Sequence, residues 1–185
     1  MATTDISPTL ETKMRSAYER GRARRAAIAT LPLLLLTVLA VALGNRPTML
    51  IAIAFVLLLT AWIFLWRGQT LGKAVIPGVL AGVVPFAFSY CARFCGHFCT
   101  ARGCMSLCMP LCTLGGALGG ALVTRFALLT PSPRLAWTSG TALLLLTGSL
   151  GCACMGTSGI AGLLTGTLLG SLTAYALTPR KPPTA

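Results

Sequence analysis

The 185-residue chain is too apolar for a soluble domain. Hydrophobic residues make up 55% of it and charged residues only 10%, whereas soluble domains carry about 25% charged residues. This composition predicts an all-α, polytopic membrane protein. The net charge of +12 comes from basic residues between apolar segments, so it indicates membrane topology and excludes direct nucleic-acid binding as its explanation.

Residues 1–25 are predicted to form a basic cytoplasmic arm with one short amphipathic helix. Ser7 suits the cap of that helix and Pro8 suits its first turn. Apolar side chains recur at helical spacing and form one stripe: Leu10, Met14, Ala17 and Tyr18. Two interpretations are equally good. The stripe and the nearby arginines lie on an anionic membrane surface, or the stripe binds a cytosolic protein.

The arm also holds every acidic residue of the chain, namely Asp5, Glu11 and Glu19. The apolar region therefore lacks the carboxylates that proton- and cation-coupled transporters usually carry inside the membrane. It also lacks an acid/base pair for catalysis, and it contains no phosphate-binding loop, zinc-protease motif or nucleophile elbow. We expect a protein that is not an enzyme.

Six apolar segments follow the arm, each near the ~20 residues that an α-helix needs to cross a bilayer. They cover residues 26–44, 48–66, 74–92, 105–126, 135–153 and 158–177, within a membrane domain of residues 26–178 that precedes a basic tail, 179–185. With both termini inside, twelve of the 15 basic residues face the cytoplasm, as the positive-inside rule requires. We expect a multi-pass protein of a bacterial inner (cytoplasmic) membrane.

A cleaved signal peptide at residues 22–43 is the alternative interpretation of the first span. A basic run there precedes an apolar stretch that ends in small residues. Cleavage would leave five spans.

The predicted orientation gathers the cysteines at the outer, periplasmic face. They occur in the segment 91–112, which we expect to form a hairpin between the third and fourth spans, and after the fifth span: Cys91, Cys95, Cys99, Cys104, Cys108, Cys112, Cys152 and Cys154. The first six form two triplets with a spacing of four residues, in mirror order about residues 100–103. A helical hairpin with its turn there would place three cysteine pairs face to face: 91 with 112, 95 with 108 and 99 with 104.

Three interpretations of these thiols stay open. They are small residues that pack helices closely, or they form disulfides across the hairpin, or they bind a soft metal ion such as Zn, Cd, Hg or Cu(I). Methionine thioethers are accessory ligands in the metal interpretation: Met105, Met109 and Met155. His97 would point away from the thiols on a helix. We therefore expect an interfacial polar residue there, with an accessory ligand as the alternative.

The later spans are predicted to pack closely through glycine. Small residues four positions apart let membrane helices approach each other, and they occur in the fourth and sixth spans: Gly115, Gly119, Gly162, Gly166 and Gly170. We expect a compact bundle whose oligomeric state the sequence does not predict.

The short arm, the six compact spans, the GNRP turn at 44–47 and the outer cysteines resemble the six-span bacterial anti-sigma factors. This family includes the sigma-F negative regulators and the light-response anti-sigma proteins of myxobacteria. The resemblance implies that the arm holds a cytosolic sigma factor, through Leu10, Met14 and Tyr18, and that thiol or metal chemistry outside releases it. The leading hypothesis is a membrane sensor that signals to this or another cytosolic regulatory protein.

The cysteines are also similar to those of mercury and copper uptake proteins, which are small polytopic carriers. That similarity implies the alternative function of a soft-metal carrier, in which the hairpin and residues 152–155 capture the ion. A structural membrane subunit with bracing cysteines is the third hypothesis.

Overall fold

The computed structural model describes residues 8–43, 47–95, 97–100, 103–106, 108–152 and 157–178. Among these it gives the backbone alone for residues 8–12, 15, 43, 47, 69–70, 92–95, 97–100, 103–106 and 108. The described chain forms helices and one two-stranded ribbon: α1 (Pro8–Leu43), α2 (Pro47–Arg67), α3 (Gln69–Cys95), β1 (His97–Thr100), β2 (Gly103–Ser106), α4 (Cys108–Leu128), α5 (Pro133–Cys152) and α6 (Thr157–Leu177).

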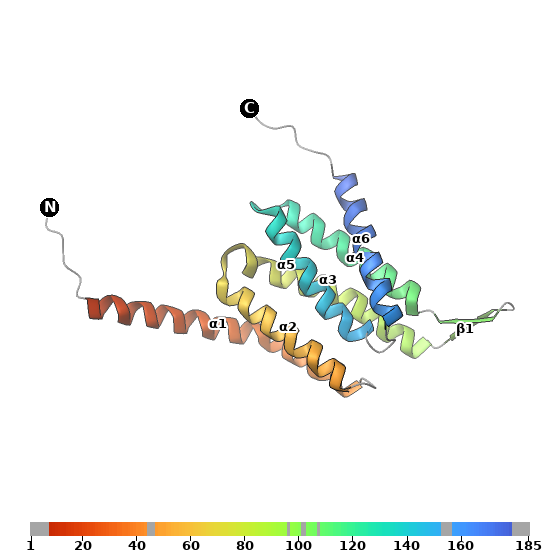
Figure 1. Cartoon of the computed structure of the whole chain (residues 1–185), viewed down its shortest axis with the longest axis horizontal. Helices are drawn as coiled ribbons and strands as arrows, with labels where there is room; N and C mark the ends of the chain where they lie inside the picture. Colours follow the sequence, from red (N-terminus) through yellow and green to blue (C-terminus); the bar gives the residue numbers. More distant parts are fainter. Residues whose placement is uncertain are drawn as a thin grey trace, which may run out of the picture.

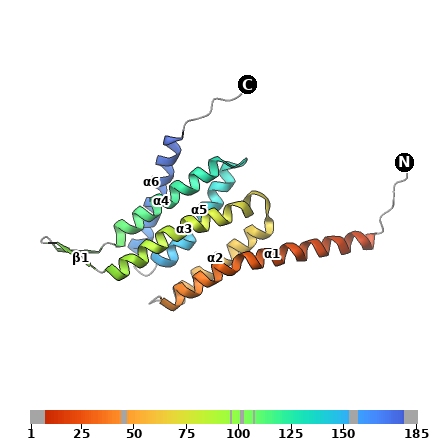
Figure 2. The same ribbon diagram turned by 180° about the vertical axis from the view of Figure 1, so that it is seen from behind.

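Within the described residues, six helices are long and apolar enough to cross a membrane. Successive helices run in opposite directions, so the bundle has two ends (Figure 1). We call the end from which β1 and β2 project the ribbon end. The opposite end, beyond which the N-terminal part of α1 extends, is the arm end. Helices α1, α3 and α5 finish at the ribbon end, and α2, α4 and α6 finish at the arm end (Figures 1 and 2).

Helix α1 joins the expected arm and the expected first span in one uninterrupted helix of 36 residues. Pro32 lies inside this helix, at a position where the missing N–H costs one backbone hydrogen bond. At 1.5 Å per residue the helix is about 54 Å long, whereas the hydrocarbon core of a bilayer is about 30 Å thick. Its N-terminal part therefore extends well past the other helices (Figure 2).

Glycines bring α4 and α6 into backbone contact. A methyl group added to Gly116 of α4 would lie 2.6 Å from the carbonyl oxygen of Leu163. From the other side, Gly170 of α6 lies directly against the backbone of Ala117, and Gly166 lies one helical turn before it. The absence of side chains at these positions lets the two helices pack through their backbones, as membrane helices with small-residue stripes do.

A second close pair is formed by α3 and α5. An added methyl group on Gly78 would lie 2.9 Å from the carbonyl oxygen of Gly140, and one on Gly82 would lie 2.6 Å from Cβ of Thr147. Gly115 of α4 lies against α3, where the corresponding distance to Cα of Pro85 is 2.7 Å. The bundle thus contains two backbone-packed pairs, α4–α6 and α3–α5, with α4 also resting on α3.

Buried side chains form two apolar clusters between the helices. The first joins α1, α2, α3 and α5 through buried side chains: Leu33, Ala40, Leu50, Ala54, Leu57, Ala61, Val75, Phe86, Leu143 and Leu150. The second joins α3, α4, α5 and α6: Ala81, Cys112, Val123, Leu144, Cys152 and Leu163. Helix α5 contributes to both clusters, so it links the α1–α2 layer to the α4–α6 pair.

Candidate thiol site at the ribbon end

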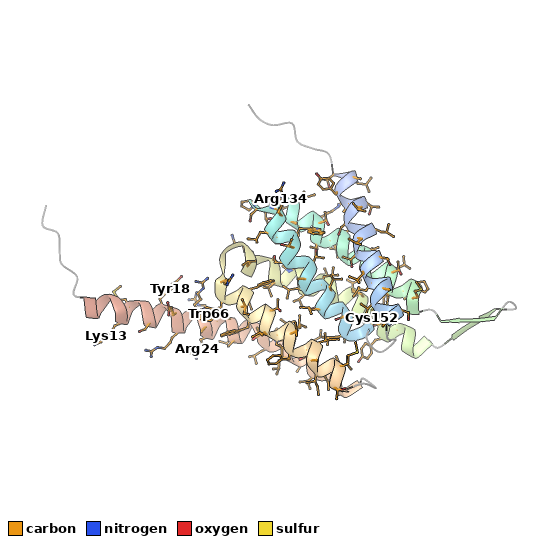
Figure 3. All side chains as sticks on the ribbon, in the orientation of Figure 1. Lys13, Tyr18, Arg24, Trp66, Arg134 and Cys152 are labelled. Carbon is orange, nitrogen blue, oxygen red and sulfur yellow. The ribbon has the colours of Figure 1, made fainter. Side chains whose placement is uncertain are left out.

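The segments that carry the described cysteines meet at the ribbon end. Helix α3 ends at Cys95, α4 begins at Cys108 and α5 ends at Cys152, while β1 and β2 project from the same end (Figure 1). Figure 3 labels Cys152 at this end of the bundle. Cys154 and Met155 lie outside the described residues. The up-and-down order of the helices therefore brings together segments that are 40 or more residues apart in the chain.

The segment between α3 and α4 is a β-ribbon, and the prediction of a helical hairpin there is wrong. Strand β1 pairs with β2 in antiparallel register, with Thr100 opposite Gly103 and Cys99 opposite Cys104. The position of the turn and the innermost pair agree with the prediction. The local conformation differs because aromatic and β-branched residues favour strands, while the glycines at 96 and 103 disfavour a helix.

The prediction that His97 points away from the thiols depended on a helix, in which positions two apart lie on different faces. In a strand, positions two apart share a face. His97 pairs with Ser106 in the ribbon, two positions from the pair formed by Cys99 and Cys104. Their side chains, and those of Cys95, Met105 and Cys108, lie outside the described part of the structure.

Cys112 has a different partner from the predicted one. Its sulfur lies 2.8 Å from the sulfur of Cys152, on the neighbouring helix α5. Cys91, the predicted partner, is a free and exposed cysteine on α3. The prediction that Cys91 faces Cys112 is therefore wrong, because α5 and not the end of α3 lies opposite the thiol of Cys112.

The Cys112–Cys152 pair is enclosed by protein. Both residues have 0% of their surface exposed. Helix α6 covers Cys112, because an added methyl group on Gly162 would lie 3.7 Å from its Cβ. On α5, Gly151 lies against Ser89 of α3. The two thiols are thus close to each other and shielded from solvent and lipid.

A hydrogen bond also joins α4 and α5 at the arm end. The indole Nε1–H of Trp137 donates to Oγ1 of Thr124 over 3.2 Å. Trp137 lies near the start of α5 and Thr124 near the end of α4. The two helices are therefore held in one register at both ends, by this bond at the arm end and by the thiol pair at the ribbon end.

Two other predicted ligands have described side chains, and both are exposed: Met109 at the start of α4 and Cys91 on α3. Among the described side chains, no group of three or more histidine, cysteine or acidic residues could hold a metal ion.

The predicted partner-binding stripe lies at the arm end. Met14 and Tyr18 have 65% and 70% of their surface exposed, and Ala17 between them is exposed as well. Figure 3 shows Tyr18 with Lys13 and Arg24 on the part of α1 that extends beyond the bundle. The side chain of Leu10 is outside the described part of the structure.

Two contacts in the structure could not be predicted from the sequence. One is the Cys112–Cys152 pair, whose residues follow no common spacing. The other is at the arm end, where the guanidinium of Arg22 lies over Gly68, the glycine with φ of 63° between α2 and α3. The sequence marks that contact only by an arginine before the first span and a glycine after the second span.

Comparison with protein-family models, with curated proteins and with solved structures finds no match to this chain.

Proposed function

We propose that this chain is a non-enzymatic membrane sensor of thiol oxidation or soft metals, whose cysteine cluster acts on a cytosolic protein bound to the N-terminal arm. One observation carries the proposal. The cysteine-bearing segments meet at the ribbon end, while the exposed apolar stripe of α1 lies beyond the arm end of the same bundle (Figure 3). A membrane sensor needs an input and an output on opposite sides of the bilayer, and the placement of these two features at opposite ends of the bundle supports that role.

The distribution of charge supports an arm end in the bacterial cytoplasm and a ribbon end in the periplasm. Arg134 and Arg24 lie at the arm end together with Trp66 (Figure 3). Basic residues on the cytoplasmic side and interfacial tryptophans are the usual features of membrane topology. The periplasm is an oxidising compartment, in which thiols at the ribbon end would form and exchange disulfides.

Packing supplies a route from the thiols to the arm. Cys152 lies two residues after Leu150, which belongs to the apolar cluster shared by α5, α2 and α1. Leu33 and Ala40 are the α1 members of that cluster. Helix α1 continues from these residues into the arm, with Pro32 inside it, so a shift of α5 changes the packing that supports α1.

The arm partner is a protein that binds an exposed apolar helix face. Met14 and Tyr18 offer such a face, and arginines flank it, so an acidic protein with an apolar groove fits it best. A sigma factor is the partner that the resemblance to anti-sigma factors implies.

The test compares two redox states of the full chain in lipid nanodiscs. Immobilised protein, reduced or oxidised with hydrogen peroxide, is incubated with the cytosolic fraction of its host. We expect one cytosolic protein to be retained in one state and released in the other. The variant Met14→Ala/Tyr18→Ala should lose this protein. The control Ser16→Ala, on the opposite side of the helix from Met14 and Tyr18 at ~100° per residue, should keep it. Equal retention by both redox states, or full retention by the Met14/Tyr18 variant, contradicts the proposal.

A further inference from the structure

We propose that Cys112 and Cys152 form a specific disulfide bond between α4 and α5. The first observation is their separation, since the two sulfurs lie 2.8 Å apart and a disulfide needs ~2.05 Å. The second is the alignment of the helices, which the Trp137–Thr124 hydrogen bond sets in the same register. Bond formation therefore requires a movement of less than one ångström and no change of helix register.

The same distance favours a disulfide over a shared metal ion. Two thiolates on one tetrahedral zinc ion lie about 3.8 Å apart, because each Zn–S bond is about 2.3 Å long. Linear coordination of a softer ion separates the sulfurs further. The 2.8 Å separation is nearer to the ~2.05 Å of a disulfide than to either metal arrangement.

Burial selects the kind of oxidant. With 0% of either cysteine exposed, a protein disulfide or a charged disulfide cannot reach the sulfurs in the folded bundle. A small, uncharged peroxide can. One thiol attacks the peroxide to give a sulfenic acid and water, and the second thiol then displaces hydroxide from that sulfur as another water. In total, two thiols and one hydrogen peroxide give one disulfide and two waters.

The bond would join the two backbone-packed pairs of the bundle. Cys112 belongs to α4, which packs on α6, and Cys152 belongs to α5, which packs on α3. In the reduced protein these pairs already touch where Gly115 of α4 lies against Pro85 of α3, and the disulfide would add a covalent link between them. The inference deepens the proposed function, on which its signalling role rests, by naming the covalent event and the helices that it locks. The bond itself can be tested without the arm.

The test uses a full-length variant that keeps only these two cysteines, with the other six changed to alanine. Reduced protein in liposomes is treated with hydrogen peroxide, free thiols are blocked, and the solubilised protein is digested with trypsin. Arg125 and Arg134, both exposed, lie between the two cysteines. The resulting fragments stay joined on a non-reducing gel only if the disulfide is present. A matched control keeps Cys91 and Cys112, which Arg93 and Arg102 separate.

We expect joined fragments that dithiothreitol releases, formed about tenfold faster than in the control, because only the Cys112–Cys152 pair is prearranged. Absence of joined fragments from a variant whose thermal unfolding matches that of the native chain overturns the inference. So does an equally fast control, or stoichiometric zinc retained by the two-cysteine variant. If that variant does not fold, tandem mass spectrometry of the oxidised native chain replaces it, and a bond between any other pair overturns the inference.

The two proposals fail separately. If the disulfide forms but retention of the cytosolic protein does not change, the proposed function is wrong and the bond stands. If the double variant Cys112→Ala/Cys152→Ala still releases that protein on oxidation, other thiols carry the signal. In that case the signalling role of this pair is wrong and the proposed function stands.

Discussion

Replacing Gly170 by alanine tests whether α4 and α6 really meet through their backbones. The added methyl carbon would lie 2.6 Å from the carbonyl carbon of Ala117, which is 0.8 Å inside the 3.4 Å at which ordinary contact begins. The neighbouring atoms are backbone atoms and cannot rotate away, so the two helices must separate. A gap of 0.5–1 Å removes roughly a quarter to a half of each dispersion contact along an interface.

The change in the free energy of unfolding is the balance of two opposing contributions, overpacking and helix preference. Overpacking of this kind costs about 1–3 kcal/mol. Alanine, in turn, is favoured over glycine inside a helix by about 1 kcal/mol. Because several backbone atoms of Ala117 block the methyl group, we expect the first term near its upper end. The free energy of unfolding of Gly170→Ala should fall by about 1–2 kcal/mol.

The control is Gly21→Ala, in the part of α1 that extends beyond the bundle. An added methyl group there has no atom within 4 Å, so only the helix preference remains and stability should stay the same or rise. Unfolding is followed by far-UV circular dichroism during titration of a mild detergent with sodium dodecyl sulfate. If Gly170→Ala unfolds at the same detergent fraction as Gly21→Ala, the close α4–α6 contact is refuted.

Three further predictions concern single contacts. Thr124→Val keeps the shape of the side chain but loses the hydroxyl that accepts from Trp137, so the same titration should give a loss of about 0.6 kcal/mol, and an unchanged midpoint contradicts the bond. Gly68→Ala forces a side chain into a left-handed conformation, which should cost about 1–2 kcal/mol; a stability equal to that of the native chain excludes this turn. With reduced protein in liposomes, N-ethylmaleimide should modify the exposed Cys91 well before the buried Cys112, and labelling of both at one rate would contradict the burial.

The spans could be predicted from the sequence because hydrocarbon imposes a strong and simple constraint. The expected spans 48–66 and 158–177 differ by one residue at most from α2 and α6 at each end. Inside a bilayer, only a helix gives every backbone N–H and C=O of a single segment a hydrogen-bond partner. The length and apolarity of a segment therefore predict a helix. The expected start of the arm helix at Pro8 agrees with α1. The continuity of this helix with the first span was not predicted, because polar residues outside the hydrocarbon can continue a helix without any hydrophobic signal.

The hairpin shows which part of a prediction depends on conformation. Any antiparallel segment that turns between Thr100 and Gly103 places Cys99 opposite Cys104, whether it is helical or extended. The pairing was therefore predictable from mirror spacing alone. The choice of strand over helix was not, because the four-residue spacing of the cysteines pointed to a helix while glycine and aromatic content pointed to a strand.

The Cys112–Cys152 contact depends on tertiary packing and has no counterpart in local sequence. It arises because α5 lies against α4 while α6 covers the thiol from outside. Mirror spacing suggested Cys91 as the partner, since that argument considers only one hairpin and ignores a third helix. The expected closeness of Cys152 to the cysteine segment came from topology, which is the one long-range constraint that a membrane sequence provides.

The length of α1 has a mechanical consequence. About 24 Å of the helix exceeds what a bilayer core accommodates, so this part acts as a lever arm with its pivot at the membrane surface. If α1 tilts as a rigid body by about 10° inside the bundle, the tip moves by about 4 Å. Such a displacement is about three-quarters of the ~5.4 Å pitch of one helical turn. A small rearrangement among packed helices would thus be magnified where the arm is exposed.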